Sequence, residues 1–122
     1  MKTPQEIQAD LRNFTGTESY FRFSAIMRNF VLTDGTKYLA EECGCYWLMD
    51  LVASHRHNYK DEGFVVAKMK KDGKGCLVRL EDGNDNILAK QHVEYTDFPL
   101  EEITLYVCRQ GDLFVILLPS EY

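Results

Sequence analysis

Apolar residues recur at two different spacings, and the change from one to the other divides the chain. Up to about residue 58 the spacing is three or four residues, which predicts helices, and from Phe64 onward it is two, which predicts strands. The first helix is predicted over residues 3–14, because Thr3 can cap its N-terminus and Pro4 suits the first helical position. Its apolar stripe consists of Ile7, Leu11 and Phe14.

Two further helices are predicted before the strands begin. A short one covers residues 37–42 and ends or bends at Gly44, and a longer one covers about residues 45–58. Residues 17–32 stay open between helix and strand, because their short aromatic runs fit both periods. The inner stripe of the longer helix consists of Leu48, Leu51, Val52 and His55.

The second half of the chain reads as strands separated by turns such as Asp72-Gly73 and Asp82-Gly83. The last strand is apolar on both faces, so it is either central and covered or part of a subunit interface. We therefore predict one α+β domain over residues 1–122, with N-terminal helices packed on an antiparallel sheet of about five strands, connected as a meander of hairpins. The strands are expected near residues 64–70, 76–81, 86–95, 102–109 and 113–118.

Composition and charge argue against several classes of protein. Hydrophobic residues make up 45% of the 122 residues, which is enough for one core. The net charge of −5 argues against a nucleic-acid-binding surface, which needs concentrated positive charge. No apolar run approaches the roughly 20 residues that cross a bilayer, and the N-terminus has no hydrophobic signal region. We expect a cytoplasmic protein with no membrane or nucleic-acid partner, whose four cysteines are thiols.

The segment EECGCYWLMDLVASHRH, residues 41–57, raises the possibility of a zinc site because it holds Cys43, Cys45, His55 and His57. Ligands of one zinc ion have α-carbons at most about 10 Å apart, given metal–ligand distances near 2 Å. On one helix Cys45 and His55 would be roughly 15 Å apart at 1.5 Å per residue. No metal site and no cofactor are therefore predicted, and the cysteines are interpreted as core residues.

No arrangement of residues in the sequence identifies a reaction. A cysteine–histidine nucleophile pair lacks a recognisable base and orienting group, and the phosphate-binding glycine motifs are missing from the sequence. No catalytic residue is assigned, and enzymatic activity stays open. Asp50 follows Trp47 by three residues on the flank of an apolar helix, and an acid beside an exposed aromatic is a recognition pair. The candidate binding residues are Tyr46, Trp47, Asp50 and His55.

Four segments carry a resemblance to a known family: FTGTESYFR (14–22), LTDGTKYLAEECGCYWLMDLVAS (32–54), YTDFPLEEITLYV (95–107) and LLPSEY (117–122). They resemble an uncharacterised family of small bacterial, phage and plasmid proteins, and the resemblance spans most of the chain. That family usually has alanine where this chain has Cys43 and Cys45, which implies packing rather than metal binding at both positions. The resemblance also marks Gly44, Tyr46, Trp47, Leu48 and Asp50 as a distinguishing segment.

These observations lead to two hypotheses of function from different classes. The first is a non-enzymatic binding protein, an acidic inhibitor or counter-defence factor of mobile-element origin that docks on a host protein. The alternative is a small-molecule or nucleotide binder, or a weak enzyme, with a pocket between the 45–58 helix and the sheet. A homodimer joined through strand 113–118 is a third possibility.

Overall fold

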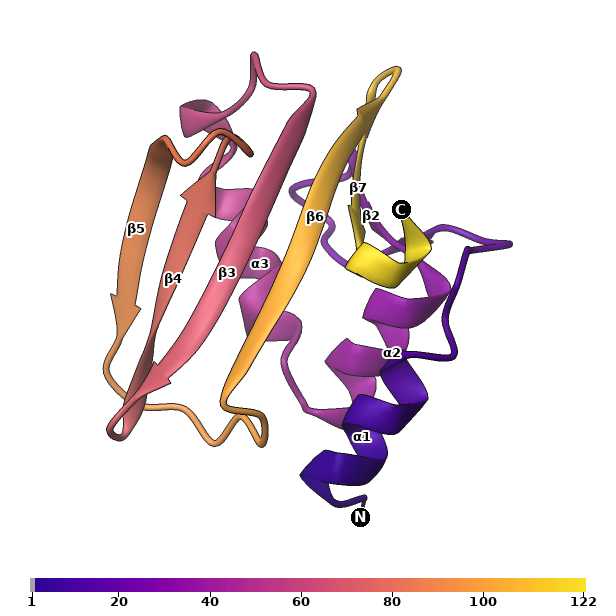
Figure 1. Ribbon diagram of the computed structural model, residues 1–122. Helices are drawn as coiled ribbons and strands as arrows, with labels where there is room; N and C mark the ends of the chain where they lie inside the picture. The colour runs from indigo at the N-terminus through magenta and orange to yellow at the C-terminus, as the bar shows by residue number, and fades with distance from the viewer. Residues whose placement is uncertain (1) are drawn as a thin grey trace.

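The computed structural model describes residues 2–122 as helices packed against one face of a mixed sheet (Figure 1). Helix α3 crosses behind the central strands, and α1 and α2 pack together beside the β2–β7 end of the sheet. The helices are α1 (Pro4–Leu11), α2 (Asp34–Glu42) and α3 (Tyr46–Ser54), with 3₁₀ turns η1 (Arg56–Asn58) and η2 (Pro119–Glu121). The strands are β1 (Phe21–Arg22), β2 (Phe30–Leu32), β3 (Phe64–Asp72), β4 (Gly75–Glu81), β5 (Ile87–Val93), β6 (Glu102–Gln110) and β7 (Leu113–Leu117).

The α+β class is confirmed, but the sheet has seven strands and is mixed rather than antiparallel with about five. The five predicted strands are present as β3 to β7, close to their predicted bounds. The two additional strands, β1 and β2, come from residues 17–32, which the sequence left undecided. Strand β2 pairs in parallel with β7. All three residues of β2 are buried, so it has no alternation of polar and apolar positions that would reveal a strand.

The predicted meander is interrupted at one connection. Strands β3, β4 and β5 follow one another, but residues 94–101 then carry the chain back so that β6 pairs with β3. This crossing segment is held by backbone hydrogen bonds from Thr96 to the Lys74 carbonyl, 2.9 Å, and from Lys71 to the Glu101 carbonyl, 2.8 Å. Its apolar side chains Phe98 and Leu100 are buried in the core. The connection is therefore anchored to the core, although residues such as Tyr95 in it are exposed.

Local chemistry at the helix ends explains where the helices begin and end. The predicted start of α1 is confirmed, because the Thr3 hydroxyl accepts from the Glu6 backbone N–H and the Glu6 carboxylate accepts from the Thr3 N–H. Helix α2 begins at Asp34, three residues earlier than predicted, with Thr33 as its cap. Gly44, at φ 59°, separates α2 from α3 as predicted. The predicted 45–58 helix is shorter, because a 3₁₀ turn replaces its last residues.

The C-terminal turn is anchored at the start of α2. One carboxylate oxygen of Glu121 accepts from the Thr33 hydroxyl at 2.6 Å and from the Leu118 N–H at 3.0 Å. The other oxygen accepts from the Gly35 N–H at 3.1 Å, where the positive end of the helix dipole favours a negative group. The Thr-Asp-Gly and Leu-Pro-Ser-Glu-Tyr segments, about 85 residues apart, are therefore one structural unit.

Strand β7 is central, which decides between the two interpretations of its apolar faces. It lies between β2 and β6, and both of its edges are hydrogen-bonded within the chain. Edge-to-edge pairing through strand 113–118 is therefore closed to a second copy. The proposed dimer through this strand would need contact through a face, where Val115 is 2% exposed.

Candidate functional site

The predicted binding residues Tyr46, Trp47, Asp50 and His55 lie on or just after α3 but do not form a pocket. Tyr46 and Asp50, four residues apart, share an exposed face of the helix. Trp47 is half-buried against the core, and His55 hydrogen-bonds through Nε2 to the Gln91 Oε1 of β5 at 2.7 Å. The space predicted as a pocket between this helix and the sheet is filled by Leu48, Met49 and Val52, each at most 1% exposed.

The four cysteines are free thiols within the packed structure. Burial raises the pKa of Cys43 to about 11, with a smaller contribution from the Glu42 carboxylate. Burial likewise raises the pKa of Cys45, Cys76 and Cys108 above the ordinary value. Neutral thiols are poor nucleophiles and poor metal ligands. Within residues 2–122, no three His, Cys, Asp or Glu side chains come close enough together to hold a metal ion.

The buried thiols should react slowly with a thiol reagent while the protein is folded. At pH 7.5 we expect Cys45 and Cys76, both 0% exposed, to react at least about 100-fold more slowly than in guanidinium, because a reactive thiolate needs exposure. Burial of the neutral Cys43 thiol raises its folded-state pKa to about 11, so the stability of the folded protein also depends on pH at this residue. The contribution of this thiol to the free energy of unfolding is fully present below its ordinary pKa of 9.0 and is lost as the pH rises toward about 11. Mass spectrometry of the labelled cysteines measures the labelling rates in the folded and unfolded protein. Rapid labelling of Cys45 in the folded protein would contradict the expected protection.

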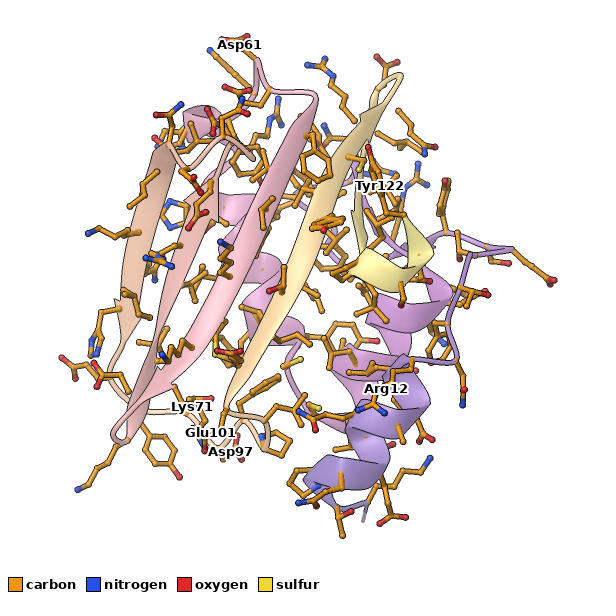
Figure 2. All side chains as sticks on the ribbon, viewed as in Figure 1. Arg12, Asp61, Lys71, Asp97, Glu101 and Tyr122 are labelled. Atoms are coloured by element: carbon orange, nitrogen blue, oxygen red, sulfur yellow. The ribbon has the colours of Figure 1, made fainter. Side chains whose placement is uncertain are left out.

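The face of the sheet opposite α3 presents a different set of side chains, and we call it the open face. Because side chains alternate along strands, the outward residues are the neighbours of buried Val65, Ala67 and Met69 on β3 and of Leu105 and Val107 on β6. Figure 2 views this face from the front, with Tyr122 of the C-terminal turn beside it. Two kinds of side chain divide the open face, aromatic and apolar toward β7 and basic toward β5.

The aromatic part centres on Phe64, Tyr106 and Tyr122. Their rings meet edge to face, with centroids 4.9 to 5.5 Å apart. Next to them lies a hollow of about 380 Å³ with Cys108, Val115 and Leu117 among its lining residues. The Tyr20 side chain also lines it, held by a 2.9 Å hydrogen bond from its hydroxyl to the Gln110 Oε1. We call this the aromatic hollow.

The basic part is a row of three cations on adjacent strands. The register places Lys68 of β3 opposite Arg79 of β4, and Arg79 opposite Lys90 of β5. Glu81 forms ion pairs with Lys68 at 3.1 Å and with Arg79 at 3.5 Å. Lys90 has no ion pair in the described part of the chain. Like charges directly opposite one another destabilise a sheet by roughly 0.2–1 kcal/mol a pair. Glu81 offsets this repulsion between Lys68 and Arg79 but forms no ion pair with Lys90 within residues 2–122.

The following row extends the positive charge. Lys70 of β3 lies opposite Leu77 of β4, and Leu77 lies opposite His92 of β5. Glu102 of β6 is the acidic neighbour of Lys70 on the other side. The sequence already contained this pattern, because Phe64, Val66 and Tyr106 occupy outward positions on strands whose other outward residues are polar. The site residues predicted on α3 do not include these outward aromatic and apolar positions.

Comparison with known proteins places the chain in a family. No helix in residues 2–122 has the length and apolar character to span a membrane. Residues 5–122 match the model described as "Family of unknown function (DUF6876)", nearly the full length of the chain. No curated protein and no solved structure matches the chain. The predicted resemblance to an uncharacterised family is confirmed, and the chain belongs to the family of unknown function DUF6876.

Proposed function

We propose that this protein is a non-enzymatic binding module that docks an acidic protein segment on its open face. The observation that carries the proposal is the aromatic hollow beside a cross-strand row of cations, Lys68, Arg79 and Lys90. In this arrangement an apolar side chain of the partner enters the hollow, and neighbouring carboxylates meet the cations. Aromatic anchors surrounded by charged groups are typical of protein interfaces.

Charge complementarity supports a protein partner with acidic residues. The chain as a whole carries −5, yet the β3–β6 part of the open face has Lys68, Lys70, Arg79 and Lys90 against Asp72, Glu81 and Glu102, an excess of one positive charge. A local positive surface on an acidic protein steers an acidic partner to that surface. In this proposal the cations of the open face select an acidic partner. The sequence had suggested the reverse, in which acidic residues of this chain occupy a basic groove of the partner.

The geometry of the rings disfavours single-stranded nucleic acid as the ligand. Bases stack on aromatic faces, whereas Phe64, Tyr106 and Tyr122 turn their edges and faces toward one another. Glu81 also neutralises part of the charge of Lys68 and Arg79. An inhibitory or counter-defence role and an origin in mobile elements are part of the same proposal. So is a cytoplasmic location, which four free thiols support.

The test compares capture of partners from a bacterial lysate by three forms of the immobilised protein. The open-face variant is Lys70→Glu with Lys90→Glu, two exposed side chains without ion pairs in residues 2–122. Its matched control, Arg56→Glu with Lys60→Glu, has the same change of charge at the end of the molecule. We expect a protein captured by wild type and control to be reduced about tenfold or more with the open-face variant, a change of about 1.4 kcal/mol.

Three outcomes would contradict the proposal. One is a lysate from which no protein is enriched, and another is a partner that binds the open-face variant as well as wild type. A third is captured material that nuclease treatment removes. Replacing two residues of the predicted α3 site with Tyr46→Ala and Asp50→Asn separates the two candidate surfaces, because loss of the partner only in that variant would assign binding to α3.

A further inference from the structure

A second hollow, of about 520 Å³, lies at the end of the molecule where η1 meets the β6–β7 hairpin. Its lining includes Arg56 of η1, Lys60 and Asp61 just after η1, and Arg109 and Asp112 of the hairpin. Figure 2 shows Asp61 at this end of the molecule. We call it the end hollow. The size falls within the range of about 300–1,000 Å³ that is usual for small-molecule sites.

The guanidinium of Arg109 is fixed in place before any ligand arrives. Its Nη1 donates to the Lys60 carbonyl at 2.8 Å and its Nε to the Gly111 carbonyl at 3.4 Å. The same group lies over the Phe114 ring, 5.4 Å from the centroid. A guanidinium held by neutral carbonyls and a ring keeps its full charge, so it is available to an anion.

The cations that line the end hollow outnumber its carboxylates by one. Arg56, Lys60 and Arg109 face Asp61 and Asp112, yet none of these five forms an ion pair within residues 2–122. On a chain with a net charge of −5, the three cations and two carboxylates around the end hollow leave a local excess of one positive charge. A local positive charge of this kind attracts a small anion.

The side chains at the base of the end hollow limit which ligands can bind there. Phe30 stacks on Phe114 with ring centroids 4.8 Å apart, and Arg109 lies over the same ring. Phe114 is consequently only 4% exposed, which leaves no aromatic face for a nucleobase. The remaining polar groups, from Asn29, Asp61 and Asp112, suit hydroxyl and amino groups.

We propose that the end hollow binds a small sugar phosphate. The phosphate is held by Arg56, Lys60 and Arg109, and the sugar hydroxyls hydrogen-bond to Asp61, Asp112 and Asn29. This site lies at the end of the predicted 45–58 segment, but it shares no residue with the predicted set Tyr46, Trp47, Asp50 and His55. Arg109 lines both the end hollow and the aromatic hollow, but Arg56, Lys60, Asp61 and Asp112 line only the end hollow, so the site does not depend on the proposed function.

The test is a titration of the ¹⁵N-labelled protein with glucose 6-phosphate, followed by amide chemical shifts at about 0.1 M salt. Glucose serves as the neutral probe, inorganic phosphate as the anion alone, and adenosine monophosphate as a nucleotide. We expect saturable shifts around residues 56–61 and 109–114 with glucose 6-phosphate. Affinity should fall about tenfold or more in Arg56→Gln with Lys60→Gln, because two of three phosphate contacts are lost. These side chains are exposed and make no ion pairs in the described chain, so the fold should be retained, as circular dichroism would check.

Each result decides the proposal. The change Arg12→Gln with Lys74→Gln removes two exposed cations outside both hollows, so it is the matched control and should leave the affinity unchanged. Absence of saturable shifts, or equal loss of affinity in both double variants, would overturn the site. Inorganic phosphate binding as tightly as glucose 6-phosphate would overturn the role given to the sugar. Preference for adenosine monophosphate would overturn the sugar phosphate in favour of a nucleotide.

Discussion

Gly35→Ala is expected to lower the free energy of unfolding by about 2 kcal/mol and the melting temperature by roughly 8 °C. A Cβ at this position would lie 2.6 Å from both the Glu121 Oε1 and the Leu118 Cδ1. Alanine is normally the better helix residue, by up to about 1 kcal/mol, so a loss of stability would show that the contact with the C-terminal turn outweighs helix propensity. Thermal unfolding followed by circular dichroism measures it.

Gly16→Ala is the matched control, because a Cβ there would meet nothing within 4 Å. We expect its melting temperature to stay within about 2 °C of wild type, because substitutions at surface positions without close contacts change stability little. Equal melting temperatures for the two alanine variants would contradict the anchoring role of Gly35.

A double-mutant cycle that combines Gly35→Ala with Glu121→Ala identifies which contact causes the loss of stability. If alanine at 35 acts by displacing the Glu121 carboxylate, the two losses of stability will not add, and the coupling should be at least about 1 kcal/mol. Additive losses would show that the collision is with Leu118 instead. Because Glu121 precedes Tyr122, displacement of this turn would also disturb the aromatic cluster on the open face.

The sequence predicted those elements whose residues alternate or recur with a clear period. Strands β3 to β7 and the capped start of α1 have both the period and the turn or cap residues that delimit them. Strand β2 does not, because Phe30, Val31 and Leu32 are buried on both sides by the sheet and its neighbours. These three buried residues form a strand because they pair with β7, and this pairing is a long-range contact that the local sequence does not reveal.

The candidate site was missed for a related reason. On α3 the sequence shows an acid next to an aromatic, but one helix cannot form a pocket without knowledge of what it packs against. The open face is assembled from β3, β4, β5 and β6, and its row of cations exists only in one register. A shift of one residue in any strand would turn that strand's cation to the other face. Periodicity along the chain fixes the alternation in each strand but not the neighbours across the sheet.

Gly75→Ala is expected to cost at least about 3 kcal/mol of unfolding free energy, a large part of the roughly 5–15 kcal/mol that stabilises a domain. A Cβ at Gly75 would overlap the Val93 carbonyl oxygen and lie 2.8 Å from the Glu94 carbonyl carbon. Both obstacles are backbone atoms, so no change of side-chain rotamer relieves the overlap. The chain at the end of β5 would have to move away from the β3–β4 turn.

The loss of stability in Gly75→Ala should be concentrated in β5 and in the crossing segment. This local pattern distinguishes it from a general destabilisation of the protein. Native-state hydrogen exchange is expected to show reduced protection of the β5 amides and of the Thr96 N–H, whose acceptor is the Lys74 carbonyl. Gly63→Ala is the matched control, because a Cβ there meets nothing within 4 Å and should change stability by less than about 0.5 kcal/mol. Equal and uniform effects of the two substitutions would contradict the assignment of Gly75 as the point where the β5–β6 connection passes close to the β3–β4 turn. That close passage lets β6 return to β3 and so places Tyr106 beside Phe64 and Thr104 beside Lys68 on the open face.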